Sequence, residues 1–356
     1  MPGEVELLEE LVAIPSVSGG ERTIAEFVEQ TVRGWGLDVV RDETSVRVEV
    51  SGFGQGQTLA LVSHLDTVPP GAGWTRDPFT PAIEGTRLFG RGSTDAKASV
   101  AAMLWAARDL AEGGRVDAGR LLVVLGYGEE TKNTSMEEAV GRLGRLDAAV
   151  IGEPTNLDIA IAQRGLMMVD LIAEGDQRHA GYAASDGEFT NAVTVLAQDL
   201  LKLPALFDDR PHPTLGLATA TATMLEAGVS RNVTPPVAKA VLDVRSTPAW
   251  THDELTERLR ESLGSEVLVT SRRLVPCETP PGSRLLAAAR TIRPDAKEFG
   301  SPTCSDWVFV RDRDAIKCGP GTSRRSHTPD EFVDLPEVTS ARGFYAALAR
   351  IYLAGG

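Results

Sequence analysis

LALVSHLD, residues 59–66, is the stretch that decides the fold, because it joins four apolar residues to a histidine and an aspartate. An almost wholly apolar run of this length is typical of a strand that is covered on both faces of its sheet. Similar apolar runs follow at 121–125 and 148–151, and segments with helical patterns separate them at 98–110 and 135–143. This alternation predicts an α/β fold with a largely parallel mixed sheet flanked by helices.

The middle of the chain has a different pattern. Between about 165 and 275 the expected order is strand, helix, strand, strand, helix, strand, which is typical of a small ferredoxin-like α+β domain. Its expected elements are 166–173, 189–203, 214–225, 238–244, 254–263 and 267–270. Around it we expect helices at 4–13, 21–35, 285–292 and 338–352 and a strand at 315–317. The chain is therefore predicted to form one domain from 1–163 and 276–356, with an inserted domain at 164–275.

The acidic composition limits the possible partners. The 356 residues carry a formal net charge of −14, which argues against nucleic acid because phosphate binding requires a basic face. No run of about 18 apolar residues occurs, so we expect no membrane-spanning helix, and the acidic start is unlike a secretory signal. Three cysteines without CxxC spacing argue against a disulfide framework and a cysteine-ligated zinc, and favour a reducing cytoplasm.

Histidines and acids follow the ends of the apolar runs. The first run leads into His64 and Asp66, the second into Glu129 and Glu130, and the third into Glu153. Because ligands bind outside the carboxyl ends of strands in open α/β sheets, we expect these side chains to point toward one crevice. Two residues elsewhere in the chain could complete the set, namely Asp95 and His327.

This mixture of side chains suits a particular class of metal site. Imidazole and carboxylate groups without cysteine are typical ligands of a catalytic zinc, cobalt or manganese ion. A carboxylate shared by two ions would hold them about 3.5–4 Å apart. Taken singly, Asp95 could cap the following helix, Asp66 could serve in a turn, and the acids at 129–130 could be an exposed charged turn. Those alternatives do not explain why such residues end several apolar strands of one sheet.

Five motifs occur along the chain in a characteristic order. They are SHLDTV at 63–68, GRGSTDAK at 90–97, GEET at 128–131, GEPT at 152–155 and HTPDE at 327–331. Together they resemble the family of acetylornithine deacetylase, succinyl-diaminopimelate desuccinylase, aminoacylase-1 and carboxypeptidase G, which are two-metal amidohydrolases. The resemblance covers essentially the whole chain. It implies a zinc-exopeptidase-like catalytic domain with an inserted lid or dimerisation domain, and a homodimer formed through that insert.

The resemblance also assigns the metal ligands by position. It implies two divalent ions, with zinc preferred over cobalt or manganese. His64 and Glu153 resemble the ligands of one ion, and Glu130 and His327 resemble those of the other. Asp95 resembles the carboxylate that bridges the two ions.

Further residues take catalytic roles by the same resemblance. Asp66 would orient the imidazole of His64 and raise its basicity. Glu129 would act as the general base, taking a proton from the attacking water and delivering it to the leaving amine. His179 would reach into the partner subunit's site and donate to the developing oxyanion, although an alanine pair at 183–184 stands where the family has a proline-containing turn. An ordinary surface histidine is the alternative.

Two residues of the insert resemble substrate contacts. Asn232 and Arg245 match family residues that hold substrate oxygens, and an arginine suits a carboxylate because its donors form a bidentate fork. The alternative for Arg245 is an ion pair with a neighbouring acid. Arg324 and Arg325 invite a similar role, but exposed loop charges are the simpler interpretation.

The resemblance implies a hydrolase that cleaves the amide bond of an N-acyl amino acid. The expected substrates are of the N-acetylornithine or N-acyl-lysine type, from arginine or lysine biosynthesis. The nearest alternative is a metallo-exopeptidase, either a dipeptidase or a carboxypeptidase, that uses the same metals and base. A second alternative is a non-catalytic relative that binds a small molecule or assembles partners. A nucleic-acid or phosphate enzyme would need a basic stripe or a phosphate loop, and the sequence has neither.

Overall fold

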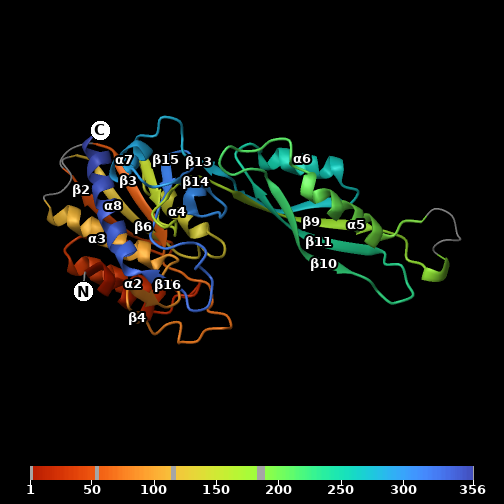
Figure 1. The fold of residues 1–356 in the computed structure, drawn as a ribbon, viewed down its shortest axis with the longest axis horizontal. Coiled ribbons are helices and arrows are strands. Elements are labelled where there is room, and N and C mark those ends of the chain that lie inside the picture. The colour runs from red at the N-terminus through yellow and green to blue at the C-terminus, as the bar shows by residue number, and fades with distance from the viewer. Residues whose placement is uncertain (1–2, 53–55, 114–117, 183–188, 356) are drawn as a thin grey trace. The chain divides into compact units, whose positions relative to one another are not determined.

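The computed structural model describes residues 3–52, 56–113, 118–182 and 189–355 and divides the chain into two compact units (Figure 1). The first unit consists of Met1–Ile161, Thr279–Phe299 and Ser305–Gly356, and the second of Ala162–Glu278 and Gly300–Cys304. The catalytic role expected for 1–163 and 276–356, and the lid or dimerisation role expected for 164–275, remain predictions. Within the described ranges, no helix is both long and apolar enough to cross a membrane.

A large mixed sheet carries the first unit's apolar runs. Its strand order is β1-β2-β6-β3-β7-β15-β8-β13, with β14 paired to β8. Strands β6, β3, β7 and β15 run parallel to one another. Strand β2 is antiparallel to β6, and β1 is antiparallel to β2. The strands are β1 (Asp38–Arg41), β2 (Ser45–Ser51), β3 (Thr58–His64), β6 (Arg120–Gly126), β7 (Ala148–Ile151), β8 (Ile159–Gln163), β13 (Cys277–Glu278), β14 (Glu298–Ser301) and β15 (Asp314–Lys317). The predicted α/β fold with a mixed sheet is confirmed.

Helices and sheet of the first unit share one hydrophobic core. The helices in that core are α1 (Gly3–Ala13), α2 (Arg22–Gly34), α3 (Lys97–Glu112), α7 (Arg284–Ile292) and α8 (Leu335–Ala354). Another helix, α4 (Thr134–Gly141), and a 3-10 helix at Asp306–Val310 contact the strands outside this core. Every residue of β3 is buried, which explains why its sequence is apolar without alternation.

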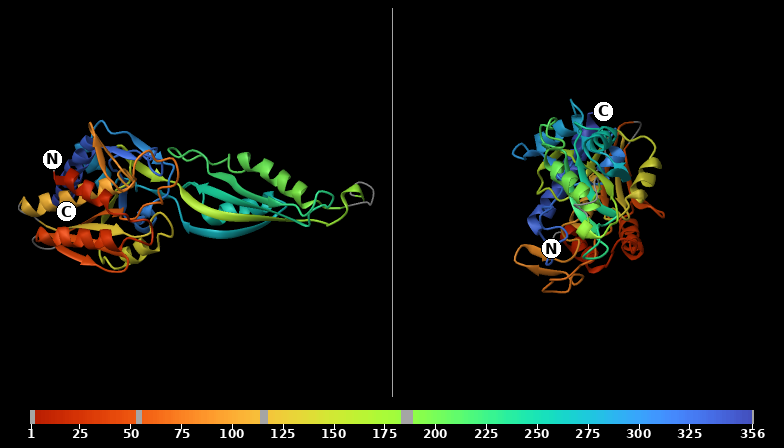
Figure 2. Two further views of the ribbon diagram at one scale, coloured as in Figure 1. Left: turned by 90° about the horizontal axis from the view of Figure 1, so that it is seen from below. Right: turned by 90° about the vertical axis from the view of Figure 1, so that its right-hand side faces the viewer.

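The second unit is a four-stranded antiparallel sheet with two helices on one face (Figure 1, Figure 2). Its elements are β9 (Gly165–Glu174), α5 (Ala192–Lys202), β10 (Thr219–Ala227), β11 (Val237–Ser246), α6 (His252–Ser262) and β12 (Glu266–Leu274). The strand order is β10-β11-β9-β12, and each neighbouring pair is antiparallel. This is the ferredoxin-like order of elements predicted from the sequence.

Two expected boundaries in this unit are wrong. The helix expected at 189–203 begins only at Ala192, because the side chain of Asn191 accepts hydrogen bonds from Val193 N and Thr194 N and caps the first turn. The strand expected at 214–225 begins only at Thr219. Before it, the backbones of His212 and Gly216 bond reciprocally at 2.8 and 2.9 Å and close a turn.

A small third sheet joins distant parts of the first unit. Its order is β16-β5-β4, with β4 at Ala82–Glu84, β5 at Arg87–Phe89 and β16 at Phe332–Asp334. Strand β5 ends just before the GRGSTDAK motif, and β16 begins just after HTPDE. Because Phe332 pairs in register with Phe89, these two motifs lie side by side.

Candidate metal centre

Three strand ends place polar side chains at one edge of the large sheet. Strand β3 ends at His64, whose register partner on the parallel strand β6 is Gly126. Strand β7 lies on the other side of β3 and ends at Ile151. Because these parallel strands end at the same edge, His64, the turn at 127–130 and Glu153 emerge next to one another.

Asp95 and His327 reach this edge from the small sheet. Asp95 lies in the loop between β5 and α3, and its peptide bond to the next residue is cis. His327 lies in the turn before β16, with a φ of 62°. The pairing of β5 with β16 therefore brings the two residues to the same place, although they are far apart in the sequence.

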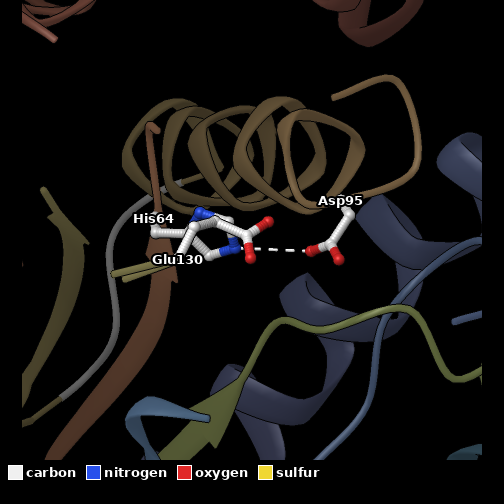
Figure 3. Close-up of side chains that lie close together, drawn as sticks. All are labelled: His64, Asp95 and Glu130. Atoms are coloured by element: carbon white, nitrogen blue, oxygen red, sulfur yellow. Dashed lines mark ion pairs between the residues drawn. The ribbon is translucent and has the colours of Figure 1, made fainter. Parts of the chain in front are cut away.

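His64, Asp95 and Glu130 lie close together (Figure 3), and the interatomic distances connect Glu153 and His327 to this group. His64 Nε2 lies 3.4 Å from Asp95 Oδ1 and 3.8 Å from Glu153 Oε1. His327 Nε2 lies 2.9 Å from Glu130 Oε1 and 3.6 Å from Asp95 Oδ2. Each oxygen of Asp95 thus faces a different histidine. Ligand atoms of His64, Asp95 and Glu130 all lie within 4.8 Å of one another.

This donor set fits metal ions. His64 Nδ1 lies 3.0 Å from the backbone oxygen of Asp66, so the Nδ1–H can donate there and leave Nε2 with its lone pair. His64 Nε2 and Asp95 Oδ1 are both buried, with no hydrogen-bond partner among the described residues. Buried polar atoms without partners are rare in proteins, and a bound cation would satisfy both.

The charges of the cluster favour a cation at its centre. Burial, followed by the charge of Asp95, raises the pKa of Glu153 to about 8. Burial also raises the pKa of Glu129 well above its ordinary value, and the charge of Glu153 adds to this while His64 opposes it. The pKa of His64 is raised despite its burial, because Asp66 and Asp95 stabilise the charged imidazole. Positive charge, from protons or from metal ions, relieves this crowding of carboxylates.

Asp66 holds the turn that carries the paired acids. Its Oδ1 accepts the N–H of Glu129 at 3.0 Å, and its Oδ2 accepts the N–H of Glu130 at 3.1 Å. Ser18 also donates to Oδ2, at 2.7 Å. No motif of the sequence points to this residue. The carboxylate lies 3.4 Å from Nδ1 of His64, farther than the backbone oxygen of the same residue. Asp66 therefore contacts the predicted ligands His64 and Glu130 and the predicted base.

The remaining predicted residues belong to the second unit. His179 is exposed, and its Nδ1 accepts the N–H of Gly181 at 3.1 Å. Asn232 is its neighbour in space, because the N–H of Ala180 donates to the backbone oxygen of Asn232 at 2.8 Å. The alanine pair at 183–184 lies outside the described residues.

Arg245 and the loop arginines are engaged differently. Arg245 forms a bidentate pair with Asp243, at 2.7 and 3.0 Å, so the ion-pair alternative is present in the structure. Arg325 pairs with Asp334 at 3.1 Å. Arg324, by contrast, is exposed.

Comparison with known proteins gives a family and related folds. The profile described as peptidase family M20/M25/M40 matches residues 60–351. A succinyl-diaminopimelate desuccinylase of Cereibacter sphaeroides is 27% identical over 383 aligned residues, which cover 98% of this chain and 99% of that protein.

Solved structures extend the likeness to the whole fold. The aminopeptidase PepT of Bacillus cereus aligns with a TM-score of 0.80 at 19% identity, covering 98% of each chain. The YXEP protein of Bacillus subtilis, described as a dinuclear metal-binding peptidase, aligns with a TM-score of 0.77 at 17% identity, covering 98% of this chain and 97% of that one.

Proposed function

Because the chain belongs to peptidase family M20/M25/M40, and so is a metallohydrolase of that family, we propose that it removes the acyl group from an N-acyl amino acid. The substrate class is an N-acetylornithine or N-acyl-lysine type amide of arginine or lysine biosynthesis. The observation that carries the proposal is the convergence of His64, Asp95 and Glu130 beside Glu129. The desuccinylase relatives, whose name denotes removal of an acyl group, support this choice.

Five residues would hold two divalent ions. His64 and Glu153 would bind one ion and Glu130 and His327 the other, with Asp95 between them; the measured approaches of 2.9–3.8 Å support this pairing. Zinc is the proposed metal because the ligands are imidazole and carboxylate, and cobalt or manganese would suit the same set. When bound, the ions lower the pKa of the attacking water and polarise the scissile carbonyl.

Glu129 would move the proton in this reaction. Its backbone is fixed by the bond from its N–H to Asp66, which limits the positions that the side chain can reach. Burial and neighbouring carboxylates raise the pKa of Glu129, so the protonated form is stabilised after it takes a proton from the attacking water. The same group can then deliver that proton to the leaving amine. The chain's own chemistry therefore needs no nucleophilic serine or cysteine.

The second unit supports a proposed homodimer. Strand β10 lies at an edge of its sheet, and almost all of its residues are exposed, including Met224 at 68% and Leu225 at 64%. An exposed apolar edge strand is a template for pairing with another chain. We propose that a second copy binds there, and that His179 serves the partner's site.

Arg245 and Asn232 would contact the substrate. The acidic charge supports neither a nucleic-acid nor a membrane partner, and the cysteine pattern supports a cytoplasmic location.

A substrate panel tests the proposed reaction. The zinc- or cobalt-loaded protein is assayed with acetyl and succinyl derivatives of ornithine, lysine and diaminopimelate, and with dipeptides. Release of the free amino acid from the acyl derivatives at the highest kcat/KM supports deacylation. Preference for dipeptides selects the metallo-exopeptidase alternative. Metal content near two ions per chain together with no turnover of any amide selects the non-catalytic alternative.

A further inference from the structure

A buried carboxylate holds the loop that presents Asp95. Glu331 is 1% exposed, and its Oε1 accepts the N–H groups of Thr94 and Asp95 at 2.9 and 3.0 Å. Its Oε2 accepts the N–H of Gly92 at 3.0 Å and the guanidinium of Arg91 at 2.6 Å. This one side chain thus accepts hydrogen bonds from three backbone N–H groups of the loop at 90–96, those of Gly92, Thr94 and Asp95. The loop lies outside the described helices and strands.

The charge of this carboxylate is balanced in place. Arg91 is also 1% exposed; besides Glu331 it donates to the backbone oxygen of Pro70 at 3.1 Å, and its guanidinium lies 5.2 Å from the ring of Trp74. A buried ion pair is best tolerated when its remaining donors and acceptors are satisfied. Here both oxygens of Glu331 accept two hydrogen bonds each, whereas Nε of Arg91 is buried without a partner among the described residues. The pair therefore brings little net charge toward Asp95.

Glu331 and His327 belong to the same short turn. The backbone oxygen of Glu331 accepts the N–H of Gly90, and Thr94 Oγ1 donates to the backbone oxygen of Phe332 at 2.6 Å. Hydrogen bonds to Glu331 and Phe332 therefore hold the loop at several points between Gly90 and Asp95. Because His327 Nε2 lies 3.6 Å from Asp95 Oδ2, these bonds fix the spacing between the two proposed ligands.

We infer that Glu331 is a positioning residue, which holds Asp95 at the distance from His64 and His327 that two metal ions require. This inference rests on the proposed function, because it gives Asp95 the bridging position. The site would then be formed before metal binds, which lowers the cost of ordering the ligands.

The substitution Glu331→Gln tests the inference. A glutamine keeps one oxygen, so its amide group must face one pair of donors and leave them without an acceptor. We expect the affinity for at least one of the two ions to fall about 10- to 100-fold, as for other groups that orient ligands. The visible spectrum of the cobalt-loaded protein should change, and kcat should fall while KM stays near the wild-type value.

The matched control is Glu337→Gln. Glu337 is half-buried and also accepts a backbone hydrogen bond, but this bond comes from the N–H of Gly321 at 2.7 Å and not from the loop at 90–96. Wild-type metal affinities and spectrum are expected for this variant. An equal loss in Glu331→Gln and Glu337→Gln, or unchanged metal affinity and cobalt spectrum in Glu331→Gln, would overturn the inference.

Two further outcomes separate the inference from the proposed function. Wild-type protein that binds no divalent ions by calorimetry refutes both. Wild-type protein that binds two, with Glu331→Gln unchanged, refutes only the role of Glu331. If Glu331→Gln does not fold, Glu331→Asp decides, because it keeps the charge but shortens the side chain by one carbon, so that the carboxylate cannot reach all four of its donors. A metal affinity lowered about threefold supports the inference, and an unchanged affinity contradicts it.

Discussion

The residues to which we give functional roles in the two units differ in how firmly the fold holds them. At the metal centre, Asp66 and Glu331 are buried carboxylates whose oxygens accept several hydrogen bonds from backbone groups. In the second unit, His179 and Asn232 are exposed, and their side chains contact only near neighbours in the sequence among the described residues, Gly181 and Tyr182 for His179 and Ser230 for Asn232. The first unit thus builds its site from its own residues, whereas the second offers side chains that a substrate or a second subunit would have to order.

Glu129→Gln is expected to have the largest effect. Removing the group that moves the proton should lower kcat by about 10²- to 10⁴-fold. Metal content should stay at the wild-type value, because Glu129 is not a proposed ligand. Turnover at the wild-type rate, measured at saturating substrate, would show that another residue is the base.

His179→Ala tests whether the second unit contributes to the partner's site. Loss of an oxyanion donor costs about 10²- to 10³-fold in kcat. The informative sample is a mixture of His179→Ala and Glu129→Gln chains, dissociated and reassembled together. If His179 acts across the dimer, mixed dimers contain one complete site and activity returns.

Two controls limit this interpretation. Each variant reassembled alone should stay inactive, and the mixture should contain dimers by light scattering. Dimers that form without regaining activity would mean that His179 serves its own chain, whereas His179→Ala that is active by itself would mean that His179 has no catalytic role.

Asp66→Asn tests whether the metal centre depends on its buried carboxylates. An asparagine cannot accept from both Glu129 and Glu130 without placing its amide group against one of them. We expect metal affinity or activity to fall about 10- to 100-fold. Asp42→Asn is the matched control, because Asp42 also accepts two backbone hydrogen bonds, from Thr44 and Ser45, but in the turn between β1 and β2 and not in the turn that carries Glu129 and Glu130. Equal losses in both variants would point to general destabilisation.

The same difference explains what the sequence reveals. The strands that end at His64, Gly126 and Ile151 are predictable because burial on both faces leaves a continuous apolar run. The polar residues that follow each run are therefore predictable candidates. Strands β4, β5 and β16 have three residues each, too few for a period. They form because β5 pairs with β4 across a short turn and with the distant β16.

Residues that act through the backbone leave no such pattern. Glu331 accepts the N–H of Asp95 across 236 positions, and Ser18 bonds Asp66 across 48. Neither contact depends on the identity of a neighbouring residue in the sequence, so periodicity and spacing give no signal for it. The position of Glu331 within the HTPDE motif is the one hint available from the sequence.

Charge on the edge strand β10 should have the smallest effect on folding and a clear effect on assembly. Met224→Glu with Leu225→Glu places charge on an exposed edge, so the free energy of unfolding should change by about 0.5 kcal/mol or less per site. If β10 pairs between subunits, the variant should be a monomer by light scattering, whereas the wild type should have twice the 38.0 kDa chain mass. Val40→Glu is the control, because Val40 is 55% exposed on β1, the edge strand of the large sheet.

A dimer that survives the β10 substitutions would place the interface elsewhere and leave His179 without the proposed route to a second site. A monomer that keeps full activity would instead show that a single chain works without a partner subunit.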